Sequence, residues 1–237
     1  MTDKAAVPSR RTLIIGCSDG IGLGTARRLL DDGFHVVGIS RSRGPLQHAA
    51  YHHEILDVGL PGYREKLAEI VTQRGPFDTC LYCAGIGEAC NLANLDQDLQ
   101  TFQVNLMAAV ATAAEVLPRM VQAQRGHLVV LSSQGDALIV PTHPSYAASK
   151  AALSSYFEAL ALAARPSGVR VTNIRFGFVD TKMAKAGARP FLRPVDWAVK
   201  IVVRAMQGKA IRVTRPRRLA PLVSLLRWLT DWRIRFS

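Results

Sequence analysis

The chain has 237 residues, of which 49% are hydrophobic and 20% charged, with a formal net charge of +12 and a pI near 10.1. This composition excludes a disordered chain, and four cysteines are too few for a disulfide scaffold of this length. We see no run of about 18 apolar residues and no secretory signal, so we expect no spanning helix and no export. The charge suggests an anionic partner: nucleic acid, an acidic membrane surface or a phosphate-bearing ligand.

Apolar runs and helical patterns alternate along the chain. Strands are predicted at 12–16, 35–40, 53–57, 79–84, 127–132, 169–175 and 210–214. Helices are predicted at 22–32, 63–74, 98–123, 145–164 and 194–208, with a loop at 181–193. Such alternation is typical of an α/β fold of the Rossmann type, a doubly wound parallel sheet. We therefore expect a single domain, residues 1–216, followed by a basic amphipathic tail, residues 217–237.

A glycine-rich turn joins the first predicted strand to the first predicted helix. Gly16, Gly20 and Gly22 have the spacing GxxxGxG, in the strand–turn–helix context that a dinucleotide-binding loop requires. Glycines let the main chain approach a pyrophosphate, and the helix N-terminus supplies free N–H groups and the positive end of a dipole. The candidate phosphate-binding residues are Gly16, Ser18, Asp19, Gly20, Ile21 and Gly22.

The end of the second predicted strand bears on the choice of cofactor. An acidic residue there would bond the ribose 2′-hydroxyl of NAD, whereas an arginine would pair with the 2′-phosphate of NADP. The sequence continues as Ser40, Arg41, Ser42 and Arg43, without an acid, which favours NADP(H) over NAD(H). The alternative is that both arginines are solvated loop charges, and Asp19 argues against NADP because a carboxylate would repel a 2′-phosphate.

A tyrosine and a lysine lie four residues apart on the predicted helix 145–164. Tyr146 and Lys150 share one helix face, and a nearby ammonium lowers the pKa of a phenol from about 10. A phenol tuned in this way can exchange a proton with a carbonyl or alcohol oxygen near neutral pH. Ser133, which follows the fifth strand, can donate to the same oxygen, and Asn105 is a polar amide within an apolar helical stretch.

Together these motifs resemble the classical short-chain dehydrogenase/reductase family over roughly residues 12–214. The matching segments are the glycine turn, Asp57-Val58, Ala84-Gly85, Val104-Asn105, Ser132-Ser133, residues 146–152 and residues 177–181. The resemblance implies a Rossmann-type fold and hydride transfer between a nicotinamide and a carbonyl/alcohol pair. The sequence departs from the family pattern at Ile15, at Tyr82-Cys83 and at Phe176, where the family usually has Thr, Asn-Asn and Pro.

The resemblance also implies a role for each matching residue. Tyr146 would be the general acid/base, Lys150 would bind the nicotinamide ribose and lower the tyrosine pKa, and Ser133 would orient the substrate oxygen. Asn105 would support a proton relay through water, and Asp57 would contact the adenine. The further cofactor contacts are Val58, Ala84, Gly85, Phe176, Gly177, Val179 and Thr181.

Three residues near the expected site are candidates for substrate contact. Gln134 and His143 lie between the serine and the tyrosine, and Met183 lies in the loop 181–193, where the family places its substrate lid. The apolar residues of this loop suggest an apolar substrate. A plain loop role is the alternative for each.

No metal site is expected, because Cys80 and Cys83 would point to opposite faces of a strand and no second ligand pair accompanies them. Four cysteines without a signal segment fit a reducing cytosol, so we expect a cytoplasmic protein.

The basic excess is concentrated at the C-terminal end. From Lys209 onward, eight Lys and Arg residues accompany one Asp, which gives 8 − 1 = +7. Drawn as a helix, residues 217–236 start near Pro221 and place Leu222, Leu225, Leu226, Leu229 and Trp232 near one face. This tail could lie on an anionic membrane, or pack on a partner subunit or on the body itself. Nucleic acid is not expected, because no recognised nucleic-acid motif accompanies the tail.

We therefore expect an NADP(H)-dependent oxidoreductase that interconverts a ketone or aldehyde and an alcohol. The Ala-rich helices 98–123 and 145–164 are candidates for dimer or tetramer contacts. The alternative is a nucleotide-binding regulatory or scaffold protein with the same fold and no turnover. The set Asn105, Ser133, Tyr146 and Lys150 favours the enzyme.

Overall fold

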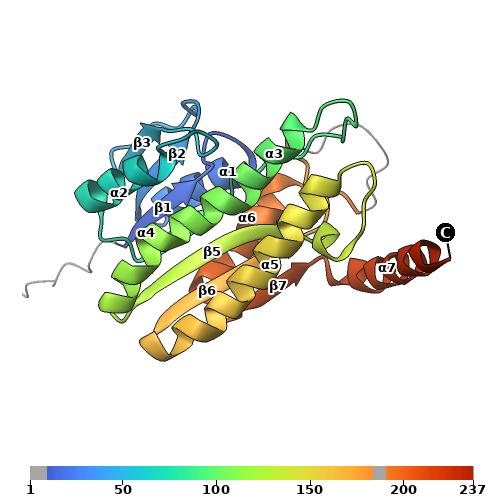
Figure 1. Cartoon of the computed structure of the whole chain (residues 1–237). Helices are drawn as coiled ribbons and strands as arrows, with labels where there is room; N and C mark the ends of the chain where they lie inside the picture. Colours follow the sequence, from blue (N-terminus) through green and yellow to red (C-terminus); the bar gives the residue numbers. More distant parts are fainter. Residues whose placement is uncertain (1–9, 184–190, 237) are drawn as a thin grey trace, which may run out of the picture.

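The computed structural model describes residues 10–183 and 191–236. Within these residues, parallel strands form one seven-stranded sheet in the order β3-β2-β1-β4-β5-β6-β7 (Figure 1). The strands are β1 (Arg11–Ile15), β2 (His35–Ser40), β3 (Tyr51–Ile55), β4 (Thr79–Tyr82), β5 (Gly126–Ser133), β6 (Val169–Phe176) and β7 (Arg212–Arg215). The strand order reverses between β1 and β4, the topological switch point at which doubly wound sheets bind ligands.

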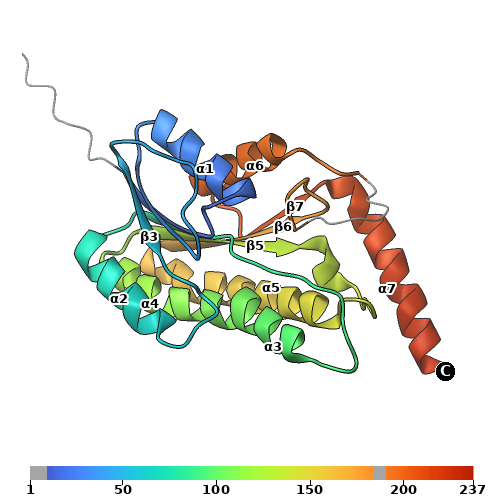
Figure 2. The ribbon, with the colours of Figure 1, turned by 90° about the horizontal axis from the view of Figure 1, so that it is seen from above.

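Helices cover both faces of this sheet (Figure 2). On one face lie α1 (Gly20–Asp31) and α6 (Val195–Gln207). On the other lie α2 (Tyr63–Arg74), α3 (Asp96–Phe102), α4 (Ala108–Gln122) and α5 (Pro144–Ala164). Short helical turns occupy Gln103–Met107, Gln134–Ala137, Arg165–Ser167 and Arg217–Leu219, and the chain ends in α7 (Ala220–Arg235).

Two hydrophobic cores form, one on each face of the sheet. Successive strand residues point to opposite faces, so Leu13 and Leu128 join the core under α2, α4 and α5, whereas Ile14 and Val129 join the core under α1 and α6. A strand that is buried on both faces has apolar residues at successive positions. The sequence therefore shows continuous apolar runs such as 12–15, and not the alternation of apolar and polar residues that a half-buried strand shows.

The predicted α/β Rossmann-type fold is confirmed, and several of its elements differ from their predicted bounds, such as β4, which was predicted to reach residue 84 and ends at Tyr82. β3 begins and ends two residues earlier than predicted, because it pairs with β2 from Val36↔Tyr51 to Ser40↔Ile55 and the pairing ends where β2 ends. β7 begins at Arg212 and not at residue 210. The predicted helix 98–123 is divided into α3 and α4 by a π-helical turn at Gln103–Met107.

One helical run among the described residues is long and apolar. The helical run Asp96–Gln122 is by length and composition apolar enough to cross a membrane, with a mean hydropathy of 1.3 in its best window. Its side chains Val104, Val116 and Met120 are nevertheless buried in the core beneath the sheet. It is therefore a core helix of the fold.

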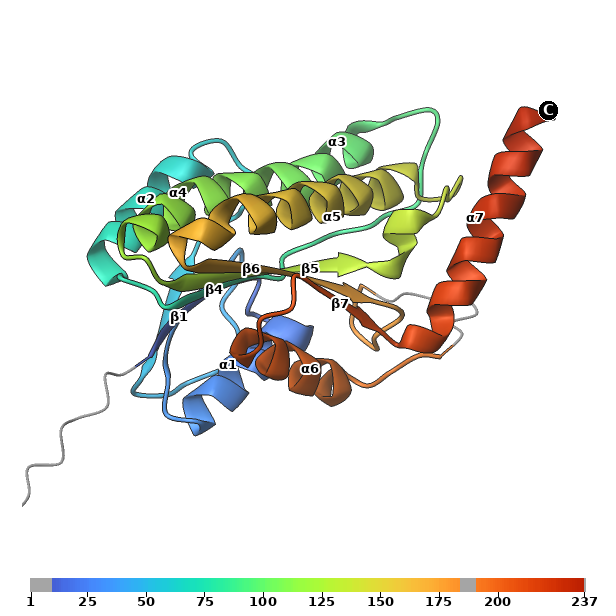
Figure 3. The same cartoon turned by 90° about the horizontal axis from the view of Figure 1, so that it is seen from below.

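The C-terminal helix α7 stands out from the body at the carboxyl end of the strands (Figure 3). The helix begins at Ala220, which confirms the predicted start near Pro221. The division of the chain into a domain 1–216 and a tail 217–237 stays a prediction.

Candidate active site

The carboxyl ends of the parallel strands lie together at one edge of the sheet (Figure 1), and the predicted site residues follow these ends. Ser40 ends β2 and Ser133 ends β5, while Gly16 follows β1 and Ala84 follows β4 by two residues. The parallel register holds these ends level, since Ile15 pairs with both Ile39 and Tyr82. Residues scattered over more than 100 positions of sequence therefore meet at the switch point.

The glycine turn is packed so closely that side chains do not fit at two of its positions. A Cβ at Gly22 would lie 2.0 Å from the Gly16 carbonyl oxygen, and one at Gly16 would lie 2.6 Å from the Ala84 nitrogen. Gly16 and Gly20 also have positive φ angles of 89° and 54°. α1 begins at Gly20, and no side chain among the described residues caps it. Its first N–H groups therefore suit an anion, and the turn fits the pyrophosphate of a dinucleotide.

The segment after β6 closes over this turn. Thr181 Cγ2 would lie 3.3 Å from a Cβ at Gly20, and Lys182 Nζ lies 2.9 Å from Asp19 Oδ2. The hydrogen bond from Lys182, followed by one from the Gly20 main chain, holds the pKa of Asp19 below its usual value. Asp19 is thus an ionised carboxylate with a cation beside it.

Two departures from the family pattern have structural roles. The Cys83 thiol donates to the carbonyl oxygens of Ile15 and Gly16, with Sγ···O distances of 3.0 and 3.3 Å. The buried Tyr82 hydroxyl donates to the Val104 carbonyl oxygen at 2.5 Å. The first contact ties β4 to the glycine turn, and the second ties β4 to the π-helical turn.

Asn105 lies in the π-helical turn and is fully buried. Its Oδ1 accepts from the Ile86 N–H at 2.8 Å, and its Nδ2 donates to the Ile86 carbonyl at 2.9 Å and to Ser149 Oγ at 3.1 Å. The side chain thereby fixes the segment that follows Ala84 and Gly85. Turns of this type are frequent at functional sites, and the relay role of Asn105 stays a prediction.

Tyr146 and Lys150 lie in the first two turns of α5, which starts with Pro144 at its first position. The Lys150 Nζ lies 6.0 Å from the centroid of the Tyr146 ring and donates to the Leu131 carbonyl oxygen at 2.9 Å. Burial lowers the pKa of Lys150 to about 8. On its other side the Tyr146 ring packs against Gly87, where a Cβ would lie 2.7 Å from the ring.

The pKa of the Tyr146 phenol is raised above the ordinary value of a tyrosine. Burial raises the pKa most, an interaction with the Ser133 side chain lowers it and the charge of Asp136 raises it. The prediction that a neighbouring ammonium lowers the tyrosine pKa is therefore wrong for this structure, because burial of the phenol dominates. The interaction with Ser133 does bring the predicted serine and tyrosine together.

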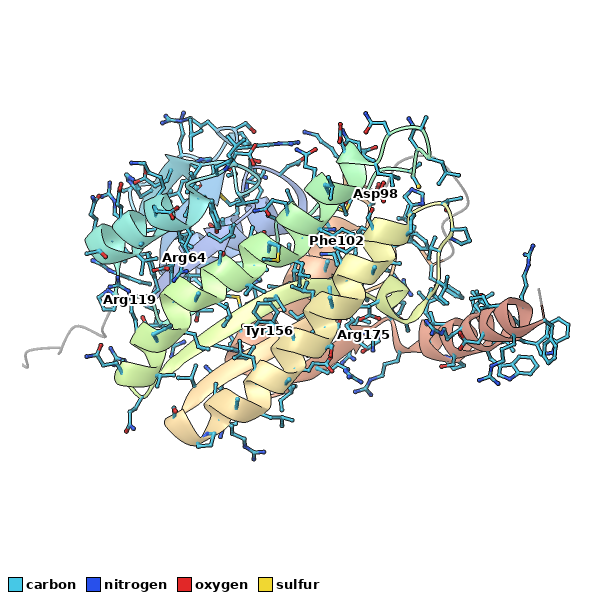
Figure 4. All side chains as sticks on the ribbon, in the orientation of Figure 1. Arg64, Asp98, Phe102, Arg119, Tyr156 and Arg175 are labelled. Atoms are coloured by element: carbon cyan, nitrogen blue, oxygen red, sulfur yellow. The ribbon has the colours of Figure 1, made fainter. Side chains whose placement is uncertain are left out.

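A buried ion pair holds the turn that follows Ser133. Ser133 Oγ accepts from the Gly135 N–H at 3.0 Å, which leaves the hydroxyl proton for another acceptor. Asp136, one helical turn on, accepts two hydrogen bonds from the guanidinium of Arg175, which is labelled in Figure 4, and one from Ser154 Oγ at 2.5 Å. The roles of Asp136, Arg175 and Ser154 could not be predicted from the sequence.

Residues predicted to contact the substrate and residues predicted to be catalytic lie close together around Gly85, which is itself a predicted cofactor contact. A Cβ at Gly85 would lie 3.3 Å from Asn105 Oδ1, 3.4 Å from Met183 Cε and 3.5 Å from Lys150 Nζ. Met183 therefore lies beside the predicted catalytic residues, as expected of a substrate contact.

The other two substrate candidates have partners of their own. The Gln134 side chain is buried and its Nε2 donates to the Pro216 carbonyl oxygen at 3.1 Å, so this amide connects the site to the C-terminal segment. His143 Nδ1 lies 3.0 Å from Thr142 Oγ1. Residues 184–190 of the predicted substrate loop lie outside the described residues.

The predicted contacts beyond the glycine turn lie along the same edge. Arg41 and Arg43 are exposed just after β2, and Ser40 Oγ donates to the Ser42 carbonyl oxygen at 2.9 Å. Asp57 Oδ1 accepts from the Gly59 N–H at 2.8 Å. Val58, Phe176 and Val179 are buried and Gly177 is half-buried. The described residues contain no group of three or more His, Cys, Asp or Glu that could hold a metal ion.

The chain is similar to known proteins over most of its length. Residues 10–189 match the family model for short chain dehydrogenases. An uncharacterized oxidoreductase of Myxococcus xanthus is 30% identical over 91% of this chain and 91% of its own length. A 3-ketodihydrosphingosine reductase of Bacteroides thetaiotaomicron is 32% identical over 71% of this chain and 64% of its own length.

Solved structures share the fold. A short chain dehydrogenase from Burkholderia cenocepacia in complex with NADP has a TM-score of 0.82 at 20% identity and covers 91% of this chain and 92% of its own. A 4-hydroxyisoleucine dehydrogenase complexed with NADH has a TM-score of 0.79 at 19% identity, covering 87% and 96%.

The fold and the site define a nucleotide-binding oxidoreductase. The chain belongs to the short-chain dehydrogenase/reductase family, as its sequence resemblance predicted.

Proposed function

We propose that this protein is an NADP(H)-dependent oxidoreductase that interconverts a ketone or aldehyde and an alcohol. The observation that carries the proposal is the meeting of Ser133, Tyr146 and Lys150 with the glycine turn at the switch point of the sheet. The family and the similarity to a 3-ketodihydrosphingosine reductase of Bacteroides thetaiotaomicron support it. A scaffold protein without turnover would not need these groups to converge.

The chemistry assigned to the chain is proton transfer and orientation. When bound, the nicotinamide supplies or accepts the hydride. Ser133 holds the substrate oxygen with its free hydroxyl proton, and the neutral Tyr146 delivers a proton to that oxygen during reduction. The raised pKa of Tyr146 keeps this phenol protonated until substrate is in place. Lys150, with a pKa of about 8, is charged at neutral pH and can re-supply the proton.

The preference for NADP(H) is supported by charge at the end of β2. Arg41 and Arg43 follow Ser40 and no acid stands beside them. Asp19 was the argument against a 2′-phosphate, and its pairing with Lys182 offsets that repulsion. Structural neighbours with NADP and with NADH are both known, so this preference rests on the residues of this chain.

Replacing Arg41 with Ala should weaken NADPH binding about tenfold or more and leave NADH binding nearly unchanged, because only NADPH has the 2′-phosphate. The measurement is the Kd of each cofactor from the quenching of protein fluorescence. Arg27→Ala, an exposed arginine on α1, is the matched control. Equal losses for the two cofactors would refute the 2′-phosphate contact.

The function itself is tested by NADPH consumption with a panel of ketones and aldehydes of increasing chain length. We expect turnover that increases with apolar chain length, because Phe178, Met183, Phe191 and Leu192 are exposed near the site. If NADPH binds but no member of the panel is reduced, the scaffold function is favoured instead.

The setting proposed for the enzyme is the reducing cytosol, where it acts as a homo-oligomer. All four cysteines are free, and two of them, Cys17 and Cys80, are buried thiols. The outer faces of α3 and α5 expose Phe102 and Tyr156, which are labelled in Figure 4 and offer apolar contacts for a second copy.

A further inference from the structure

α7 presents an apolar face that the body does not cover. At about 3.6 residues per turn, Leu222, Leu225, Leu226, Leu229, Trp232 and Phe236 share one side of the helix. In the structure Leu225 is 52% exposed, Leu229 45% and Trp232 57%. One alternative predicted from the sequence was that the C-terminal tail packs on the body of the protein. That alternative is therefore wrong for the apolar face of α7.

The base of α7 is nevertheless fixed to the active-site edge. Leu219 is buried, and its Cδ1 would lie 2.7 Å from a Cβ at Gly177. The hydrogen bond from Gln134 to the Pro216 carbonyl fixes the same segment to the turn that follows Ser133. The position of α7 is thus set by residues next to the catalytic ones.

Charge indicates what covers the apolar face. From Arg215 to Arg235 there are six arginines and one aspartate, so this segment carries 6 − 1 = +5. Arg233 lies next to Leu226 and Leu229 within the apolar face, and Arg235 lies beyond Trp232 at one margin of it; long basic side chains can reach past buried apolar groups to an anionic surface. A second copy of α7 would bring the same positive charge, which opposes pairing of two such helices.

Further exposed apolar side chains lie at the same end of the molecule. Leu92 and Leu95 precede α3, Ile139 precedes α5 and Phe178 follows β6, and all four are exposed. The turn Gln134–Ala137, just before Ile139, packs against α7, and Gly177, just before Phe178, packs against Leu219 at the base of α7. Exposed apolar side chains therefore lie both on α7 and on the segments at its base, next to the candidate active site.

We propose that α7 and the segments at its base dock on an anionic lipid membrane, and that the substrate is a ketone on a long apolar chain dissolved in that membrane. The docking is independent of catalysis, whereas the substrate class rests on the proposed function. Trp228 and Trp232 suit the boundary between headgroups and acyl chains, and the arginines suit anionic headgroups.

The test uses the full chain and two charge-matched variants. Leu229→Glu alters the apolar face, whereas Ile234→Glu makes the same charge change on the opposite side of α7, at a residue that is 58% exposed against 45% for Leu229. Flotation is measured with phosphatidylcholine vesicles and with vesicles in which about one third of the lipid is phosphatidylglycerol. Reduction by NADPH is measured with a long-chain ketone held in the anionic vesicles and with a short, water-soluble ketone.

We expect the wild type to float only with anionic vesicles, Leu229→Glu to lose at least about tenfold in membrane partitioning and Ile234→Glu to lose much less. Leu229→Glu should also lose reduction of the vesicle-held ketone and keep that of the soluble one.

No flotation of the wild type, or equal flotation of the two variants, would overturn the docking even if both ketones are reduced. An assembly that dissociates on Leu229→Glu, seen by light scattering, would show a second copy on α7 and overturn it too. Normal flotation without reduction of either ketone would support the docking and overturn the substrate class together with the proposed function.

Discussion

Replacing Tyr146 with Phe should reduce kcat for ketone reduction by about 10²- to 10⁴-fold, the usual contribution of a positioned general acid. The change removes one hydroxyl, and the ring that packs against Gly87 stays in place. NADPH binding and the thermal stability of the protein should therefore change little. The measurement is single-turnover reduction of the best ketone in the panel, with the Kd of NADPH taken on the same sample.

The matched control is Tyr156→Phe, which removes the hydroxyl of an exposed tyrosine on the same helix. Its kcat should stay within about twofold of wild type, as expected of a surface substitution. A Tyr146→Phe enzyme that works as well as the control would exclude Tyr146 as the proton donor. Ser133 and Lys150 would then have to act on a different group.

Replacing Asp136 with Ala should lower the free energy of unfolding by about 3–5 kcal/mol, the usual cost of leaving one partner of a buried ion pair alone. The Asp136 and Arg175 side chains are only 4% and 17% exposed, so the guanidinium would lose its counter-charge where water cannot fully replace it. Ser154 would lose its acceptor as well. Urea unfolding followed by circular dichroism measures the difference.

The comparison for this variant is Glu69→Ala, which breaks the exposed pair of Glu69 with Lys66. Because water solvates both of these side chains, the loss should be below about 1 kcal/mol. If Asp136→Ala is no less stable than Glu69→Ala, the buried ion pair of Asp136 and Arg175 does not contribute to the free energy of unfolding as proposed. Asp136→Ala should also lower kcat, because Ser133 lies next to the turn that the Asp136 side chain holds in place.

The fold and the positions of the candidate catalytic residues could be predicted because they depend on local patterns. The apolar runs that form β1 and β5 follow from burial on both faces, and the positions of Tyr146 and Lys150 follow from helical spacing. The end of β3 could not be predicted, because it is set by pairing with β2 and not by its own residues.

Contacts between distant segments were also beyond sequence reasoning. Asp136 meets Arg175 across 39 positions, and Asn105 meets Ile86 across 19, so no spacing rule signals either contact. The tyrosine pKa was predicted with the wrong sign for the same reason. Spacing shows that Lys150 is near Tyr146, whereas the depth at which the phenol is buried depends on the whole fold.

The thiol of Cys83 gives the cofactor loop an anchor that does not titrate. Burial raises the pKa of Cys83, so its proton stays in the hydrogen bonds to Ile15 and Gly16 throughout the physiological pH range. Thiol reagents attack the thiolate, and the folded protein should therefore be slow to react at this position. Cys83, which stands where the family usually has an amide side chain, thus holds the glycine turn with an uncharged group. We expect this contact to be independent of pH and the thiol to resist alkylation.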